Sequence, residues 1–427
     1  MSRSGAHRSA SPYGSSSRGA GFFVRLTALV VALLVVLAGV FVGVQLSRGT
    51  PEASATVVAH GVLTAPGSRP SLPTPTHGAT YVQVEGLGTI ASHNAGEELP
   101  LASITKLVTA LVVLHHHPLS PGQQGPEITV TSAVGAAYPG EAAVHDSVIP
   151  VRTGERLSEY QCLEALLVPS ADNIADLLAT WTAGSTSAFV AEMNAEAASL
   201  GLHHTHFVDP SGLDAASQGT ARDLVRLGKV VLSQPLLAHL VALPQVDLPL
   251  AGVVYNFNYV LGRDGIIGIK TGSTLYAGGD FLWAARRKVG GHTVTVVGAV
   301  LDQQGKVPIQ AALHAAERLS VAAFDSLHQV TLLPSGRTLV RVTTPWGAST
   351  RAITTRAVSA FGYPGEQVSA SVHMDGTAAG GRLRTPLAAG TRLATLEVQL
   401  PSGTVSVPAT TVTEVAGPSI SWKLERL

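Results

Sequence analysis

The chain has 427 residues, too many for one ordinary domain, and its 45% hydrophobic content is sufficient for a sizeable core. Lysine and arginine together number 28, as do aspartate and glutamate, so the formal net charge is zero. This balance argues against a general nucleic-acid-binding protein, which needs surplus basic side chains to displace counterions from phosphates. The single cysteine, Cys162, excludes an intrachain disulfide, and its apolar surroundings predict a small buried side chain.

The N-terminal region divides into a polar tail and an apolar run. Residues 1–25 are rich in Ser, Gly and Arg and are expected to be disordered. Residues 26–46 are almost entirely apolar, and about twenty such residues cross the hydrocarbon layer of a membrane as a helix. The sequence therefore predicts a single transmembrane helix.

The arginines around this run predict its orientation. One arginine, Arg48, follows it closely, whereas four precede it: Arg3, Arg8, Arg18 and Arg25. The excess of positive charge before the helix favours a cytoplasmic N-terminus, a cell-membrane anchor and an extracytoplasmic remainder. A signal peptide cleaved near residues 53–55 is the alternative. The apolar run is longer than such a peptide needs, so an anchor is favoured.

Residues 47–77 contain many Pro, Ser and Thr and are expected to be a flexible linker with a mean reach of roughly 30 Å. Residues 78–327 show strand patterns, then helical patterns, then strands and a helix again. The expected strands cover 79–85, 89–92, 265–270, 279–285 and 292–301, and the expected helices cover 103–114, 158–181, 186–200, 220–232 and 308–327. This order predicts an α/β domain in which the first and last strands of an antiparallel sheet lie together beside a helical insertion.

The last hundred residues, 328–427, have a different pattern. Short alternating runs are separated by Gly and Pro, as at residues 330–333, 339–344, 367–372 and 391–398. This pattern predicts a separate small all-β domain.

Ser103 and Lys106 are the first pair of residues that indicate chemistry. A serine in the first helical turn faces the positive end of the helix dipole, and a lysine three positions later lies on the same face. Its amine can accept the serine proton if burial and a second nearby cation favour the neutral form. By itself the spacing is weak evidence, because an N-cap serine and a surface lysine give the same pattern.

A second cation follows the strand that ends at Lys270. Only six lysines occur in the chain, and Lys270 ends an uncharged strand just before Thr271 and Gly272. A lysine supplies charge, a threonine supplies a hydrogen bond, and a glycine lets a substrate backbone approach closely. This combination suits a carboxylate-binding strand, although a solvated lysine at the sheet edge is the simpler reading.

Taken together, these residues resemble a known family. Ser103-x-x-Lys106, then Ser170-Ala171-Asp172, then Lys270-Thr271-Gly272 look like the three active-site motifs of penicillin-recognising serine enzymes, in the same order. Three further segments are similar to the D-alanyl-D-alanine carboxypeptidase branch: residues 207–214, 220–224 and 265–273. The resemblance extends over residues 79–301. It implies the α/β fold of β-lactamases and transpeptidases, with an antiparallel sheet flanked by helices plus a helical subdomain.

The resemblance also implies roles for individual residues. Ser103 would attack the penultimate D-Ala carbonyl of a peptidoglycan stem peptide ending in D-Ala-D-Ala, Lys106 would be the general base, and Ser170 would relay protons. Lys270 and Thr271 would hold the terminal carboxylate, with Gly272 beside them, and the backbone N–H groups of Ser103 and Ser273 would form the oxyanion hole. β-Lactams would be trapped at the acyl-enzyme stage. No cofactor, metal or nucleic acid is implied.

Asp172 departs from the family pattern, which has asparagine at that position. An ionised aspartate can bind substrate by accepting from an N–H group, or it can pair with Lys106, but it cannot donate a hydrogen bond to a substrate carbonyl. Pairing with Lys106 would favour the ammonium form of the lysine. Either Asn173 takes over the role, or the site tolerates aspartate, or turnover is reduced.

Alternatives to the carboxypeptidase remain open on the sequence. They are a D,D-endopeptidase or a β-lactamase of the same superfamily, or a catalytically inactive wall-binding homologue. The histidines at 115–117 and at 203, 204 and 206 lack a complete set of metal ligands and are expected to be dipole partners and loop residues.

Overall fold

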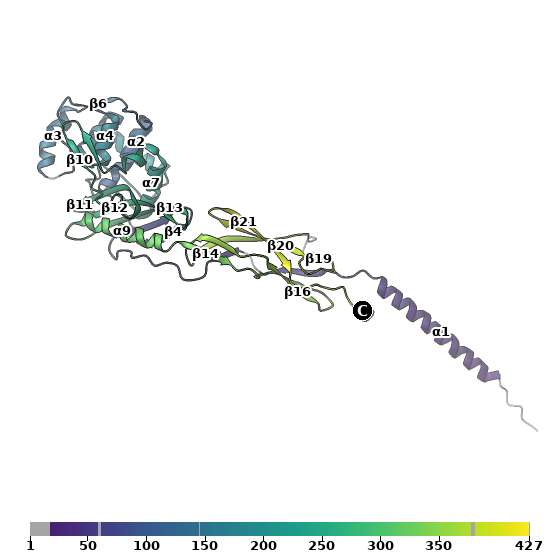
Figure 1. The fold of residues 1–427 in the computed structure, drawn as a ribbon. Helices are drawn as coiled ribbons and strands as arrows, with labels where there is room; N and C mark the ends of the chain where they lie inside the picture. Colours follow the sequence, from purple (N-terminus) through teal and green to yellow (C-terminus); the bar gives the residue numbers. More distant parts are fainter. Residues whose placement is uncertain (1–17, 59–60, 145, 377–380, 427) are drawn as a thin grey trace, which may run out of the picture.

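The computed structural model describes residues 18–427 apart from 59–60, 145, 377–380 and 427. Three parts follow one another along a long molecule: an isolated helix, a β part and an α/β part (Figure 1). The helix α1 covers Arg18–Ser47, and it begins before the predicted apolar run. It is the one helix of the described residues long and apolar enough to cross a membrane, and an 18-residue window within Gly21–Ser47 has a mean hydropathy of 2.8. The remainder of the predicted N-terminal tail, including Arg3 and Arg8, lies outside the described residues.

The α/β part is built on a five-stranded antiparallel sheet in the order β11-β12-β13-β3-β4. Its strands are β3 (Ala79–Val84), β4 (Gly88–His93), β11 (Ile266–Thr274), β12 (Gly278–Val289) and β13 (His292–Gln303). β13, the last of these strands in the sequence, pairs with β3, the first, over residues 296–301, with Ala299 opposite Tyr81. The prediction that the two ends of this region meet in one sheet is therefore confirmed.

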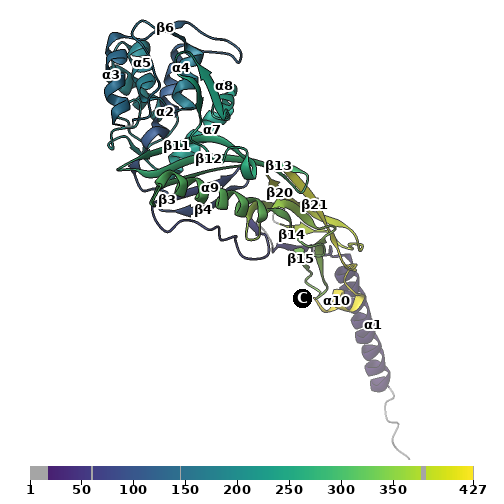
Figure 2. The same ribbon diagram turned by 60° about the vertical axis from the view of Figure 1, so that its left-hand side comes forward.

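Helices cover both faces of this sheet (Figure 2). On one face lies α9 (Pro308–Asp325), whose buried side is apolar apart from Ser320. On the other lies α7 (Ala221–Ser233), with the helical subdomain beyond it. The subdomain helices are α2 (Lys106–His116), α3 (Ser132–Ala143), α4 (Glu159–Leu167), α5 (Asp172–Ala183), α6 (Thr186–Ser199) and α8 (Pro235–Leu240). The short strands β5 (Leu99–Pro100), β6 (Glu127–Thr129), β7 (Arg156–Ser158), β8 (Gln218–Gly219), β9 (Gln245–Leu248) and β10 (Gly252–Tyr255) connect these helices.

The single helix predicted over residues 158–181 is wrong, because the structure forms two helices there. The first, α4, ends at Leu167 and the second, α5, begins at Asp172. Pro169 cannot continue a helix, and Ser170 has a φ of 64°, which is left-handed backbone. The break removes Ser170 from a helix surface and places it in a sharp turn. Cys162 is buried in α4, as predicted.

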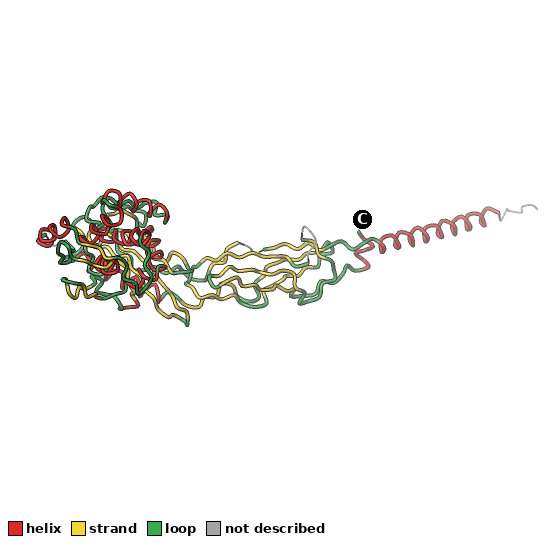
Figure 3. Tube along the Cα trace, turned by 90° about the horizontal axis from the view of Figure 1, so that it is seen from above, coloured by secondary structure: helices red, strands yellow, loops and turns green. Residues whose placement is uncertain are grey.

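The β part contains an eight-stranded sheet in the order β19-β1-β15-β16-β21-β20-β18-β2. Its C-terminal strands are β15 (Thr338–Thr343), β16 (Ser349–Thr354), β18 (Gln367–Met374), β19 (Arg382–Leu383), β20 (Arg392–Leu400) and β21 (Gly403–Thr411). A separate pair, β14 (His328–Leu333) and β17 (Val358–Gly362), shares one apolar core with this sheet. Figure 3 shows these strands running along the long axis of the molecule. The predicted all-β character of the C-terminal region is confirmed.

Two strands of this sheet come from the segment predicted as a linker. β1 (Ala53–Val57) pairs with β15 and β19, and β2 (Gly61–Thr64) pairs with β18. The short helix α10 (Ile420–Glu425) brings the C-terminal end of the chain back to the end of α1, where Arg426 donates to the backbone carbonyls of Gln45 and Arg48. The β part is therefore assembled from both ends of the chain.

Candidate active site

Ser103 lies in a short 3-10 turn, Ala102–Thr105, that leads directly into α2. From Leu101 to Val113 every residue is buried except Ser103, which reaches solvent. Ala102 has a φ of 44°, so the chain turns sharply just before the serine. Two glycines make this turn possible. A Cβ on Gly212 would come within 1.8 Å of the Ala102 carbonyl oxygen, and one on Gly272 within 3.1 Å of the Ser103 nitrogen. The local backbone thus places the Ser103 hydroxyl within reach of solvent, just before a helix whose first turns are buried.

Lys106 is completely buried one turn later. Its Nζ donates to Ser103 Oγ at 2.8 Å, to Asp172 Oδ1 at 2.5 Å and to the Ser211 carbonyl oxygen at 2.9 Å. These three bonds use all three protons of an ammonium group. The lysine is therefore oriented toward the predicted nucleophile and is fully hydrogen-bonded, as a buried charge must be.

Asp172 begins α5 and is itself buried. Its Oδ1 accepts from Lys106, and its Oδ2 accepts from the Ser147 N–H at 3.1 Å. The neighbouring Asn173 is engaged elsewhere, because its amide bonds both the N–H and the carbonyl of Ile149. At this position the geometry places Asp172, and not Asn173, against Lys106.

Ser170 and Lys270 form a second hydroxyl–amine pair. Lys270 Nζ donates to Ser170 Oγ at 3.0 Å and to the Thr271 carbonyl oxygen at 3.0 Å. Both side chains are buried, and so is Thr271. Gly272 follows on the same strand and lies against Ala102. Ser273 is exposed and its hydroxyl donates to the Gly278 carbonyl. The structure thus brings together Ser103, Lys106, Ser170, Asp172 and Lys270, which lie far apart in the sequence.

The buried charges perturb each other's protonation. Burial, helped by the positive charge of Lys106, lowers the pKa of Lys270 to about 7, while Asp172 opposes this shift. Burial raises the pKa of Asp172, and the hydrogen bond and charge of Lys106 oppose that change. Perturbed titratable groups of this kind gather at sites of chemistry. Two amines and one carboxylate therefore share a water-poor site next to the partly buried hydroxyl of Ser103.

Comparison with known proteins identifies this arrangement. The family model of D-alanyl-D-alanine carboxypeptidases matches residues 78–304, which is more than half of the chain. The chain belongs to the D-alanyl-D-alanine carboxypeptidase family. A D-alanyl-D-alanine endopeptidase of Pseudomonas aeruginosa is 29% identical over 62% of this chain and 82% of its own length. A D-alanyl-D-alanine carboxypeptidase of Mycobacterium tuberculosis is 32% identical over 46% of this chain and 65% of its own length.

Solved structures agree with this assignment. The DD-transpeptidase of Streptomyces K15 is 28% identical, with a TM-score of 0.51 over 60% of this chain and all of its own. A D-alanyl-D-alanine carboxypeptidase from Francisella tularensis is 18% identical and has a TM-score of 0.55 over 82% of this chain. The latter likeness shows a shared fold only. The predicted α/β class is confirmed, and the protein is a serine peptidase of the carboxypeptidase family.

Sequence analysis missed a loop that supports this carboxypeptidase site. The carboxylate of Asp209 accepts hydrogen bonds from Ser211 Oγ, Ser217 Oγ and the N–H groups of Gly212 and Leu213. This network fixes the loop that offers the Ser211 carbonyl to Lys106. The only signal in the sequence was the resemblance of residues 207–214 to the carboxypeptidase branch, because a backbone carbonyl has no side-chain signature.

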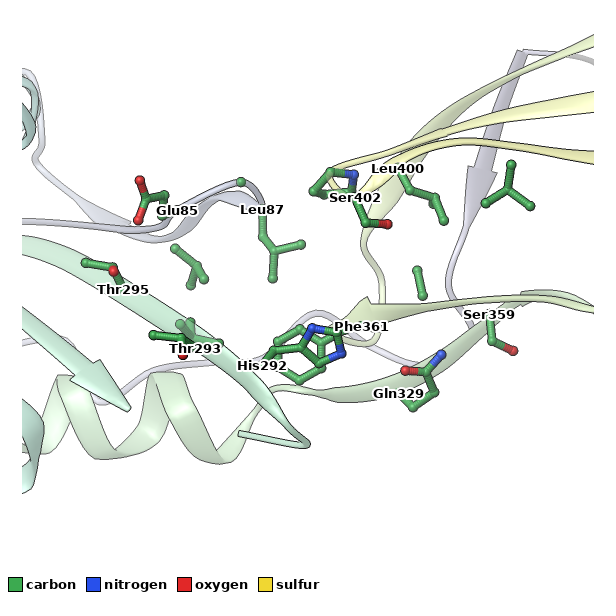
Figure 4. A pocket seen from close by; sticks show the side chains of 16 residues that line it. Glu85, Leu87, His292, Thr293, Thr295, Gln329, Ser359, Phe361, Leu400 and Ser402 are labelled. Carbon is green, nitrogen blue, oxygen red and sulfur yellow. The ribbon is translucent and has the colours of Figure 1, made fainter. Parts of the chain in front are cut away.

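A cavity of about 550 Å³ in this family member lies away from the nucleophile, at the junction of the α/β and β parts (Figure 4). It is lined by the β3–β4 turn, the start of β13 and strands of the β part, and His292 stacks on Phe361 with ring centroids 4.6 Å apart. None of its lining residues belongs to the Ser103 site. Among the described residues, no group of three or more His, Cys, Asp and Glu side chains is placed to hold a metal ion.

Proposed function

We propose that the protein removes the terminal D-Ala from peptidoglycan stem peptides, with Ser103 as the nucleophile and Lys106 as its base. The observation that carries the proposal is that two hydroxyl–amine pairs lie in one site. Ser103 Oγ lies 2.8 Å from Lys106 Nζ, and Ser170 Oγ lies 3.0 Å from Lys270 Nζ. Cleavage of a peptide bond next to a terminal carboxylate requires a nucleophile within hydrogen-bond reach of a base. It also requires a second cation nearby to bind that carboxylate.

Each residue has a defined part in this proposal. Ser103 loses its proton to Lys106 as its oxygen bonds the penultimate D-Ala carbonyl carbon, and backbone N–H groups of Ser103 and Ser273 hold the oxyanion. The peptide C–N bond then breaks, and Ser170 passes a proton to the leaving amine. Lys270, Thr271 and Gly272 receive the substrate's terminal carboxylate, which favours the charged form of Lys270. Water hydrolyses the acyl-enzyme, and a β-lactam would stop at that stage.

The apolar helix α1 supports a proposal about location. With Arg25 near its N-terminal end and the catalytic region after it, α1 would anchor the protein in the cell membrane with its N-terminus in the cytoplasm. The active site would then face the peptidoglycan layer.

The test uses the full chain in detergent, a fluorescent penicillin and a peptide ending in D-Ala-D-Ala. Covalent labelling together with release of free D-Ala is the expected result. Replacing Ser103 by Ala should abolish both, by roughly 10³-fold or more, whereas replacing the exposed Ser199 of α6 by Ala should change neither. Labelling of Ser103→Ala, or no labelling of the unmodified chain, would contradict the proposal. Rapid penicillin turnover would instead indicate a β-lactamase.

A second candidate activity has its own support. Endopeptidases of Pseudomonas aeruginosa and Escherichia coli are among the relatives, at 29% and 32% identity. A cross-linked peptide dimer separates the two activities. A carboxypeptidase releases D-Ala from the free stem and leaves the dimer intact, whereas an endopeptidase splits the dimer at a comparable rate.

A further inference from the structure

The three hydrogen bonds of Lys106 raise a question about how it becomes a base. An ammonium that donates to Ser103 Oγ, Asp172 Oδ1 and the Ser211 carbonyl has no free lone pair, so it cannot accept a proton from Ser103. One of its protons must leave first. The Ser211 carbonyl is a backbone acceptor that does not take up protons at neutral pH, and Ser103 is the group to be deprotonated.

Asp172 is the remaining partner and is suited to take this proton. Its Oδ1 lies 2.5 Å from Lys106 Nζ, and the side chains of the two residues are only 6% and 0% exposed. Burial penalises two separate charges more than a neutral carboxylic acid beside a neutral amine. The raised pKa of Asp172 agrees in direction with such a shift.

We propose that Asp172 accepts a proton from Lys106 before acylation, so that the buried carboxylate and amine act as one pair that holds a single shared proton. This inference rests on the proposed function of Ser103. Asp172 does not touch the reacting atoms; it acts through Lys106 and is a positioning residue for the proton.

The proton balance of the step is closed. Lys106 gives one proton to Asp172 and becomes a neutral amine. Ser103 then transfers its proton to Lys106 as the bond between its oxygen and the carbonyl carbon forms. When the C–N bond breaks, Lys106 supplies a proton through Ser170 to the leaving amine. The proton held on Asp172 afterwards returns to Lys106, and no external oxidant, reductant or metal takes part.

The second oxygen of Asp172 also favours a carboxylate over an amide at this position. Oδ2 accepts from the Ser147 N–H at 3.1 Å, while Oδ1 accepts from Lys106. An asparagine satisfies both neighbours only if its NH₂ group faces Lys106, and this orientation requires a neutral lysine. The family pattern of asparagine and this chain's aspartate therefore imply two different ways to prepare the same base.

The charged groups around the pair set the background for a pH test. The charges of Lys106, Lys270 and Asp146 act on the carboxyl group of Asp172. The charge of Asp172 in turn acts on Glu141 and on Asp176 of the same helix. Lys270 must be charged to bind a carboxylate, so its titration is expected on the basic side of the activity profile. The low-pH limb of the activity profile then reflects protonation of the Lys106–Asp172 pair, and this apparent ionisation belongs to both groups together.

The deciding experiment measures the second-order rate of acylation of the full chain by a fluorescent penicillin from pH 5 to pH 10. In the unmodified protein the shared proton moves within the pair, so the rate stays constant until the pair gains a second proton at low pH. In Asp172→Asn, Lys106 must release its proton to solvent, which becomes harder as the pH falls. The acid limb of this variant should therefore lie about one pH unit or more higher.

The competing explanation predicts a shift of opposite sign. If Asp172 only stabilises the charge of Lys106, its removal makes the lysine easier to deprotonate, and the acid limb moves to lower pH. A downward shift, or an upward shift below about half a unit, would overturn the proposal. Asp172→Ala should shift the limb upward like Asp172→Asn. Asp176→Asn, which removes a neighbouring carboxylate without touching Lys106, should not shift it upward.

Two readouts separate failure of this inference from other failures. Complete labelling after long incubation at pH 9 counts the folded protein in each variant, and a merely structural role would lower the rate equally at every pH. If the unmodified chain is not labelled at any pH, the proposed function itself fails. If it is labelled but the limbs shift in the wrong direction, only the proton-sharing pair is excluded.

Discussion

The two faces of the five-stranded sheet use burial for different purposes. The face under α9 is filled by apolar side chains such as Phe281, Trp283 and Leu313. On the side of the helical subdomain, Lys106, Asp172 and Lys270 are buried to a similar degree. Burying apolar surface stabilises the fold, whereas burying charge costs free energy unless hydrogen bonds compensate. Both faces of the sheet bury apolar side chains, and the subdomain face additionally buries the charged groups of the proposed chemistry.

Among the variants that test this comparison of the two faces, Lys270→Met is expected to have the largest effect. The variant loses the cation that binds the substrate carboxylate and that contacts Ser170, and truncating one partner of a buried charge pair typically costs 2–5 kcal/mol. We expect kcat/KM for D-Ala release to fall by about 10³-fold. The unfolding free energy near pH 6 should not fall, because a buried cation has been removed. A large loss of stability there would show that the Lys270 side chain itself contributes to the packing of this face.

The same variant tests the pH dependence of stability. The pKa of Lys270 is lowered to about 7 in the folded protein, below the ordinary lysine value of 10.5. The unfolded chain therefore binds more protons between these two values, so stability should rise with pH across that window. In Lys270→Met this contribution disappears. Thermal unfolding at pH 6, 8 and 10 should show a smaller rise for the variant than for the unmodified protein.

Phe281→Ala probes the opposite face and should give the next largest effect. Phe281 is completely buried against the α9 side, and truncation of a buried phenylalanine costs about 3–5 kcal/mol. Denaturant unfolding followed by tryptophan fluorescence measures this loss. The rate of penicillin acylation at a temperature where the variant remains folded should stay within about twofold. A large selective loss of acylation would mean that the two faces are coupled.

Gly212→Ala should have a smaller but specific effect on the site. The residue has a φ of 82°, and a Cβ there would lie 1.8 Å from the Ala102 carbonyl oxygen, next to Ser103. Displacement of the nucleophile by about 1 Å can cost 10²-fold in rate. The matched control is Gly184→Ala at the end of α5, where φ is 77° and no atom lies within 4 Å of the added Cβ. Equal acylation rates in the two variants would show that backbone strain, and not the contact with Ala102, limits the site.

Much of the site could be predicted from the sequence because its motifs are local. Ser103 and Lys106 lie one turn apart and Lys270 to Gly272 are consecutive, so each motif can be read in the sequence, and their order along the chain indicates that they belong together. The sequence left open whether Asn173 takes the role of the family's asparagine or Asp172 is tolerated there, because that choice depends on how the backbone at Ser147 and Ile149 packs against α5. The contribution of Ser211 was missed, since it comes from a backbone carbonyl.

The elements of the fold also differ in how well they could be predicted from the sequence. Helices α6, α7 and α9 follow the apolar periodicity of their own residues and were predicted nearly to their ends. The strands β1 and β2 are short and rich in Ala, Ser, Thr and Gly, so their own composition resembles a linker. Their pairing partners, such as Val342 opposite Ala55, lie almost three hundred residues away. No local pattern reports a hydrogen-bonding partner at that distance.

The pairing of β1 and β2 with the C-terminal strands has a mechanical consequence. The chain enters the β part before it forms the catalytic region and returns to the β part afterwards, so two covalent crossings, and not one, join the two regions. A double connection resists swivelling more than a single flexible tether does. Tension between the apolar helix and the catalytic region would pass first into the hydrogen-bonded ladders of β1. The segment between α1 and the α/β part is thereby held in a sheet, instead of being averaged over the conformations of a loose coil (Figure 1).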